Sequence, residues 1–77
     1  MKFRIIKTVK YKGCNVYLRN IGNTFEYLAV IRGQVYAAHV IIKKRWFQRE
    51  YTKLQFEKAT NMIEKMAEAT IDSVLEG

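Results

Sequence analysis

The densest group of chemically distinctive side chains is a basic and aromatic segment of seven residues. Its sequence places four cations and two aromatic rings side by side: Lys43-Lys44-Arg45-Trp46-Phe47-Gln48-Arg49. Lys and Arg contact phosphate oxygens, and an exposed aromatic ring can stack on an unpaired base. Alternatively, Trp46 or Phe47 closes the hydrophobic core where the chain turns back. We expect Lys43, Lys44 and Arg45 to contact phosphate, with Trp46 as a candidate stacking residue.

Positive charge is concentrated in the first two thirds of the chain. Residues 1–49 contain eleven Lys or Arg and a single acid, Glu26, whereas residues 50–77 contain three Lys and six acids. The formal net charge of the 77-residue chain is +7. Basic surfaces of this density meet nucleic acid more often than anionic lipid or an acidic protein.

Side chains that perform catalysis or bind metal ions are sparse. The chain has one His, one Cys, one Ser and one Asp, and Glu26 is the only carboxylate before residue 50. This set offers little material for a catalytic triad, a paired-carboxylate site or a thiolate metal cage. We therefore expect a non-enzymatic protein without metal or cofactor, in which His39 lies on a sheet face and Cys14 packs at a turn.

Glycine spacing and β-branched runs predict the first part of the fold. Gly13, Gly22 and Gly33 lie about ten residues apart, at positions where tight hairpin turns would form. The runs between them predict strands over 3–11, 14–21, 24–32 and 35–42, with the third turn at Arg32-Gly33 or Gly33-Gln34. Two-residue connections force neighbouring strands to be antiparallel, so we expect a four-stranded meander.

The apolar period changes to that of a helix after residue 50. Apolar side chains recur at helical spacing from Phe56 to Val74. Thr52 and Gln55 form a capping-box pattern, with Tyr51 and Phe56 at staple positions around it. The sequence therefore predicts a single α+β domain over 1–77, ββββα, with a sheet over 1–42, a basic aromatic connection over 43–51 and a helix over 52–76.

Two-residue turns fix the register and so assign side chains to the two faces of the sheet. The face under the helix is expected to be apolar, with Phe3 and Ile5 on the first strand and Lys7 and Asn20 as polar exceptions. On the opposite face we expect Ile6, and an ion pair between Arg19 and Glu26. The same face is expected to bind phosphates and bases through Arg4, Lys10, Tyr17, Arg19 and Arg32.

Two apolar groups are candidate interfaces. Leu28, Val30, Val35 and Ala37 are too apolar for bare solvent, and could form a dimer contact, a binding floor or a patch beneath the loop after the fourth strand. On the helix, Met62 and Met66 form a dimer contact unless the sheet covers them.

These patterns favour a non-enzymatic nucleic-acid-binding protein, with single-stranded DNA or RNA preferred and weak sequence specificity. The alternative is a small adaptor or inhibitor that docks on an acidic protein, with a homodimer compatible with either function. No apolar run is long enough to span a membrane, and the polar side of the helix is acidic, so we expect no membrane partner. No signal-peptide stretch follows Met1, which predicts a cytoplasmic protein.

Overall fold

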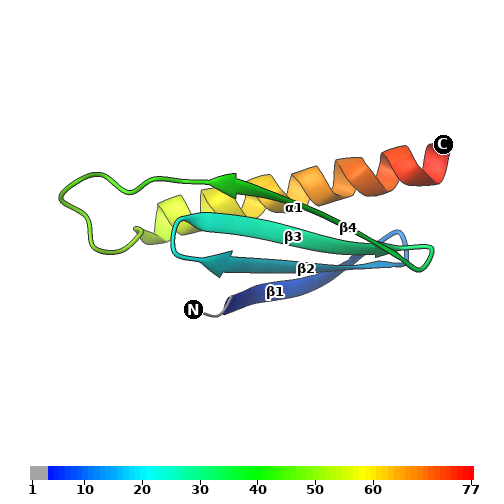
Figure 1. Ribbon diagram of the computed structural model, residues 1–77, viewed down its shortest axis with the longest axis horizontal. Coiled ribbons are helices and arrows are strands. Elements are labelled where there is room, and N and C mark those ends of the chain that lie inside the picture. Colours follow the sequence, from blue (N-terminus) through cyan, green and yellow to red (C-terminus); the bar gives the residue numbers. More distant parts are fainter. Residues whose placement is uncertain (1–3) are drawn as a thin grey trace.

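The structure, a computed structural model, describes residues 4–77, so Phe3 of the expected first strand lies outside it. Four strands form one antiparallel sheet in the order β1-β2-β3-β4, and one helix follows (Figure 1). The elements are β1 (Arg4–Tyr11), β2 (Cys14–Ile21), β3 (Thr24–Ile31), β4 (Gln34–Ile41) and α1 (Lys53–Glu76). The predicted ββββα order and α+β class are confirmed. Within the described residues, no helix has the length and apolar character needed to cross a membrane.

The three hairpin turns explain why the strands pair in this register. Both central residues have positive φ in the first turn (Lys12 49°, Gly13 80°) and in the third (Arg32 52°, Gly33 80°), as a type I′ turn requires. The third turn is therefore Arg32-Gly33, and β3 ends one residue earlier than predicted. Placement of Arg32 on a sheet face was wrong, because this residue lies at the tip of the β3–β4 hairpin.

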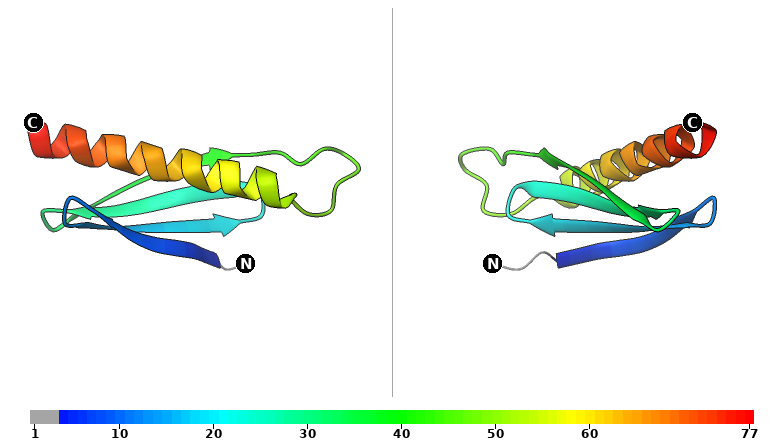
Figure 2. Two further views of the ribbon diagram at one scale, coloured as in Figure 1. Left: turned by 180° about the vertical axis from the view of Figure 1, so that it is seen from behind. Right: turned by 45° about the vertical axis from the view of Figure 1, so that its right-hand side comes forward.

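The helix α1 covers one face of the sheet and leaves the other without a covering element (Figure 2). Ala59, Ile63, Ala67 and Ile71 recur every four residues and are buried against the middle strands. The alternation of Ala with Ile lets the helix approach the sheet while the larger side chains fill the space between. We call the covered side the helix face, and its buried strand residues are Cys14, Val16, Leu18, Phe25, Tyr27, Ala29 and Ile31.

The start of α1 follows its sequence signals. Gln55 donates its backbone N–H to Thr52 Oγ1 at 3.1 Å, and the Gln55 side chain accepts from the Thr52 N–H at 2.9 Å. Tyr51 and Phe56 lie on either side of this cap and both pack edge-on against Phe25, with ring centroids 5.4 and 5.3 Å away. The predicted capping box is confirmed, and it joins the helix start to the core.

A β-bulge in β1 corrects the predicted faces of its first residues. Lys7 pairs with Leu18 on the helix face, and the next pair is Ile5 with Arg19, so Ile6 is the extra residue. One inserted residue reverses the alternation of every side chain before it. Ile6 consequently packs against the core and Ile5 is exposed on the opposite side. The predicted faces of both isoleucines were wrong.

Arg4 changes sides for the same reason. It pairs with Asn20, whose partner on β3 is the fully buried Phe25, so Arg4 lies on the helix side of the sheet. Its predicted placement beside Arg19 on the uncovered face was wrong, whereas Asn20 is where the sequence placed it.

The two edges of the sheet differ in chemistry. The outer strand β1 carries the bulge and three cations, Arg4, Lys7 and Lys10. The other outer strand, β4, has the sequence QVYAAHVI, without Lys, Arg, Asp or Glu. Bulges and edge cations discourage the addition of another strand, so β1 is a protected edge and β4 is not.

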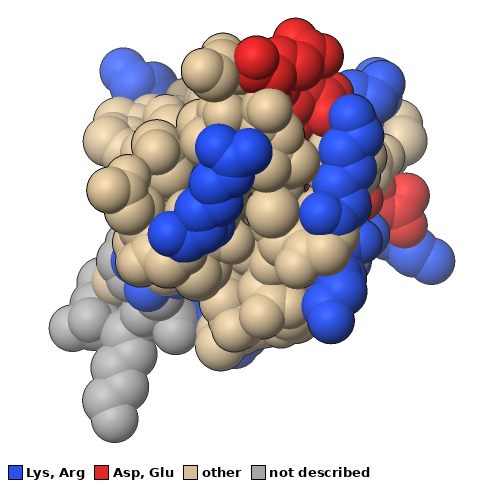
Figure 3. Space-filling model, turned by 90° about the vertical axis from the view of Figure 1, so that its right-hand side faces the viewer, with Lys and Arg blue, Asp and Glu red and all other residues tan. Residues whose placement is uncertain are grey.

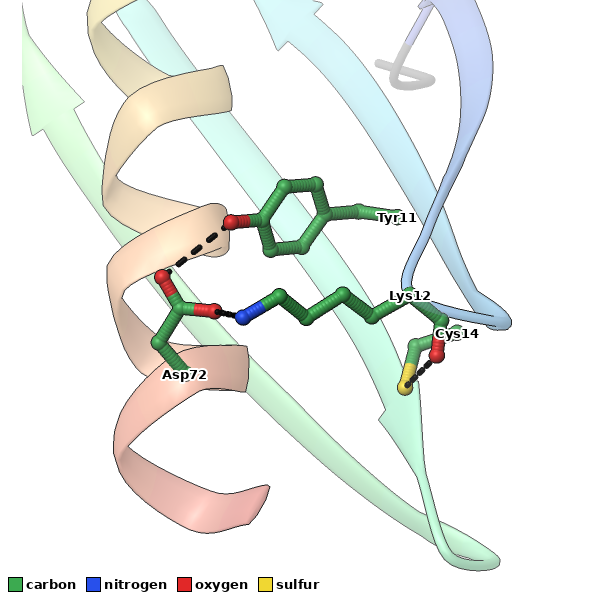
Figure 4. Close-up of polar contacts among 4 residues, drawn as sticks. All are labelled: Tyr11, Lys12, Cys14 and Asp72. Atoms are coloured by element: carbon green, nitrogen blue, oxygen red, sulfur yellow. Dashed lines mark hydrogen bonds and ion pairs between the residues drawn. The ribbon is translucent and has the colours of Figure 1, made fainter. Parts of the chain in front are cut away.

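Polar contacts fasten α1 to β1 and to the turn that follows it. Lys7 Nζ lies 2.8 Å from Glu64 Oε1 near the middle of the helix. Further along, Asp72 accepts a hydrogen bond from the Tyr11 hydroxyl at 3.1 Å and lies 2.6 Å from Lys12 Nζ (Figure 4). The hydrogen bond from the Lys12 ammonium, helped by that from Tyr11, lowers the pKa of Asp72 below its ordinary value of 3.8.

Replacing Asp72 by Asn should reduce the loss of stability that the protein undergoes as the pH falls. Between the lowered pKa of Asp72 and 3.8, the unfolded chain binds protons that the folded chain does not, so acidification destabilises the wild-type fold. Urea unfolding followed by circular dichroism, from about pH 7 to about pH 3, measures this dependence. We expect the free energy of unfolding to fall less in Asp72→Asn than in wild type, with the exposed Glu57→Gln as the control. Parallel profiles for Asp72→Asn and wild type would contradict the assignment.

Candidate nucleic-acid interface

The connection between β4 and α1 projects beyond the end of the sheet, on the side where β1 begins and β2 turns into β3 (Figures 1 and 2). At its base the Tyr51 hydroxyl donates to the Ile42 carbonyl and lies 2.9 Å from Asn23 Oδ1. The Ile42 N–H in turn donates to the Asn23 carbonyl at 2.8 Å. Burial raises the pKa of Tyr51, which keeps its hydroxyl protonated as a donor. The connection therefore starts and ends at fixed points.

Trp46 and Phe47 occupy the tip of this connection. They are the central residues of a turn in which the Gln48 N–H donates to the Arg45 carbonyl at 2.9 Å. Trp46 is 95% exposed and Phe47 is 61% exposed, and their rings meet edge-to-face with centroids 5.5 Å apart. The reading in which either residue closes the core was wrong. Tyr51 and Phe56 already pack against Phe25 at that position.

Gln48 holds the aromatic turn to the helix. Its Oε1 accepts from the Arg45 N–H at 3.0 Å, and its Nε2 donates to Gln55 Oε1 at 3.0 Å. Gln55 donates back to Gln48 Oε1 at 3.3 Å while it also closes the cap on Thr52. This pair of side-chain amides connects the exposed turn to the first turn of α1. Sequence reasoning missed Gln48, and the only signal for it was its position seven residues before the capping Gln55.

A groove of about 480 Å³ lies beside the connection, between the start of β1, the β2–β3 turn and the start of α1. Arg4 and Lys44 line it together with one carboxylate, Glu50. Lys44 Nζ lies 4.6 Å from the centre of the Tyr51 ring, a cation–π contact that directs its side chain toward the groove. The bulge in β1 brings Arg4 to this groove, so residues 40 positions apart supply its two cations.

The remaining predicted cations are dispersed. Lys10 lies near the β1–β2 turn and Arg32 lies in the β3–β4 turn, both at the opposite end of the molecule from the connection (Figure 1). That end shows cations and acids with uncharged surface between them (Figure 3). Arg19 forms an ion pair with Glu26 directly across the β2–β3 ladder, as the register predicted. These cations do not form one basic platform with residues 43–49.

The side of the sheet away from α1, here called the open face, carries both apolar and polar side chains. Its side chains form three cross-strand rows and a shorter fourth one. The rows are Lys10–Asn15–Val30–Val35, Thr8–Tyr17–Leu28–Ala37, Ile5–Arg19–Glu26–His39 and Ile21–Thr24–Ile41. Tyr17 and the candidate interface residues Leu28, Val30, Val35 and Ala37 therefore lie on the predicted face. Met66 packs against the core beneath α1, whereas Met62 is exposed.

Comparison with protein-family models, with curated proteins and with solved structures finds no match. Among residues 4–77, His, Cys, Asp and Glu form no group of three that could hold a metal ion.

Truncating Trp46 should leave the fold intact. Because the ring is 95% exposed, we expect Trp46→Ala to change the free energy of unfolding by no more than about 0.5 kcal/mol. Phe25→Ala, at a fully buried position, should destabilise the protein by about 3–5 kcal/mol. Urea unfolding followed by circular dichroism compares the two. A loss of more than about 1.5 kcal/mol in Trp46→Ala would mean that the ring packs against the protein in solution.

Proposed function

We propose that this protein binds single-stranded nucleic acid, without catalysis, through its connection end. We define the connection end as the cations and exposed rings of the β4–α1 connection together with the groove beside it: Arg4, Lys43, Lys44, Arg45, Trp46, Phe47 and Arg49. The observation that carries the proposal is the position of Trp46 and Phe47. A closed turn holds both rings in solvent, and four cations flank them within seven residues.

Exposed aromatic rings and cations contribute to binding in different ways. Stacking of a base on an aromatic side chain is worth about 1–3 kcal/mol and tolerates any base, because each base has a flat face. The cations supply sequence-independent attraction to phosphate. Gln48 and Gln55 fix the turn before any ligand arrives, which reduces the conformational entropy lost on binding.

The geometry favours single strands over duplex. An exposed ring can stack only on a base that is not already stacked and paired within a duplex. The groove beside the connection adds Arg4 and Lys44 for phosphates, with Tyr51 and Phe56 in its lining. The amides of Gln48 and Gln55 are occupied by one another, so few groups remain to read base edges, and we expect weak sequence specificity.

The proposal includes a cytoplasmic location, where nucleic acid is present and the free thiol of Cys14 stays reduced. The alternative ligand is an acidic protein, which the same cations would attract without a need for the rings. The contribution of Trp46 to the binding affinity therefore distinguishes a nucleic-acid ligand from an acidic protein.

Charge reversal at the connection end should weaken binding and lower its salt dependence. Fluorescence anisotropy of labelled single-stranded DNA, single-stranded RNA and duplex DNA of equal length, at several salt concentrations, gives the affinity and its slope. Each phosphate contact on a single strand contributes about −0.7 to the slope of log K against log salt, so Lys43→Glu/Arg45→Glu should make it shallower by about 1.4. The control is Lys58→Glu/Lys65→Glu, which changes the net charge equally on exposed positions of α1. Equal losses in both variants, or no binding by wild type at low salt, would refute the site.

Trp46→Ala should weaken binding of single strands by roughly 5- to 150-fold, the equivalent of about 1–3 kcal/mol, while the salt slope stays the same. The chain has a single Trp, so quenching of its fluorescence by unlabelled oligonucleotide reports contact at the turn directly. Polyglutamate serves as the competitor without bases. If it binds as tightly as the oligonucleotides and Trp46→Ala binds both unchanged, the ligand is an acidic protein rather than nucleic acid.

A further inference from the structure

The open face carries exposed apolar side chains that α1 does not cover (Figure 2). Three of its apolar side chains, Ile5, Val35 and Ile41, are between 61% and 65% exposed, and they lie on three corners of the face. Leu28, Val30 and Ala37 lie beside Val35 on the two strands β3 and β4. The row that contains Arg19, Glu26 and His39 separates this apolar group from Ile41. Exposed apolar side chains grouped in this way, without an element that covers them, mark an interaction site.

The charges of the open face are nearly balanced. Arg19 and Glu26 pair with each other, and the remaining cation of the rows, Lys10, lies on the outer strand β1, where its amine can reach water at the rim. Nucleic acid and acidic proteins are recognised by cations without a local counter-charge, and this face does not concentrate them. Its ligand is therefore apolar, and distinct from the ligand of the connection end.

The dimensions of the face fit a second copy of the chain. Strands of eight residues are about 27 Å long, and four of them span about 19 Å, which gives roughly 500 Å² per copy. This is close to a tenth of the 5616 Å² accessible surface of the protein, the fraction that a typical interface covers. Two copies would together bury about 1,000 Å², which reaches the lower bound for a specific interface.

We propose that the open faces of two copies pack against each other to form a homodimer with a two-layer β-sandwich at its centre. Sheets packed face to face lie about 10 Å apart, and the side chains of the two open faces fill the space between them. The same patch serves on both subunits, as a two-fold axis requires. Each α1 lies on an outer surface, and each connection end projects past the sheets, so the dimer leaves both proposed nucleic-acid sites accessible.

Sedimentation equilibrium of wild-type protein, over a range of about 1 to 100 µM, tests the proposal. We expect a particle of twice the chain mass at the upper end. Because the net charge of +7 opposes association while apolar contacts drive it, the dimer should persist or strengthen when salt rises from about 0.05 to about 0.5 M. Nucleic-acid binding should instead weaken as salt rises, so failure of the dimer and failure of the proposed nucleic-acid site can be distinguished. A monomer at 100 µM under both conditions would overturn the dimer.

Substitutions locate the contact. Leu28→Lys and Val35→Lys place like charges at the centre and at a corner of the proposed interface, and each should give a monomer at every concentration. The control is Leu54→Lys, because Leu54 is 60% exposed but lies on α1. Val35 is so exposed in the single chain that its replacement keeps the test valid even if Leu28→Lys fails to fold.

The position of Leu28 on an inner strand separates face packing from edge pairing. A dimer formed by pairing the β4 edges would survive Leu28→Lys, and that outcome would overturn the proposal. In a folded monomeric Leu28→Lys or Val35→Lys variant, quenching of Trp46 by single-stranded oligonucleotide should remain, since the connection end is unchanged. Loss of the dimer in Leu54→Lys as well would show that the effect of added charge is not specific to the open face, and would overturn the proposal.

Discussion

A single helix packs against one side of a four-stranded sheet, and most other features of the molecule depend on this contact. The buried apolar residues of α1 repeat every four positions and meet alternate residues of β2 and β3. Because cross-strand neighbours share a face, that contact also determines which side chains point away from the helix. The open face remains uncovered because the fold has four strands and only one helix to pack against them.

The helix start links this core to the surface that we assign to nucleic acid. Gln55 caps α1 through Thr52 and, with the same side chain, holds Gln48 and the aromatic turn. Tyr51 packs on Phe25 and fixes both ends of the connection. The exposed rings are thus positioned by groups whose main role is to begin a helix, which explains how a connection without regular secondary structure can present a defined surface.

The sequence was sufficient for the fold and only partly sufficient for the site. Gly13, Gly22 and Gly33 marked the turns, and Thr52 with Gln55 marked the helix start, because these signals are local. The bulge was not predictable, since Ile5 and Ile6 are both apolar and either could face the core. Because the bulge was not predicted, Arg4 was assigned to the wrong face of the sheet. The exposure of Trp46 was undecided for a different reason: it depends on whether Tyr51 and Phe56 fill the core at that end, which only the packed structure shows.

The unequal edges of the sheet limit how far the protein can assemble. A strand can be added beside β4, which has no charged side chain, but the bulge and cations of β1 discourage it on the other side. If two sheets joined through β4, the joined sheet would end in β1 on both sides. Addition of further strands to that sheet would stop at two copies, because neither outer edge accepts another strand. The bulge and cations of β1 thereby oppose the growth of fibrils from a sheet that is otherwise rich in β-branched residues.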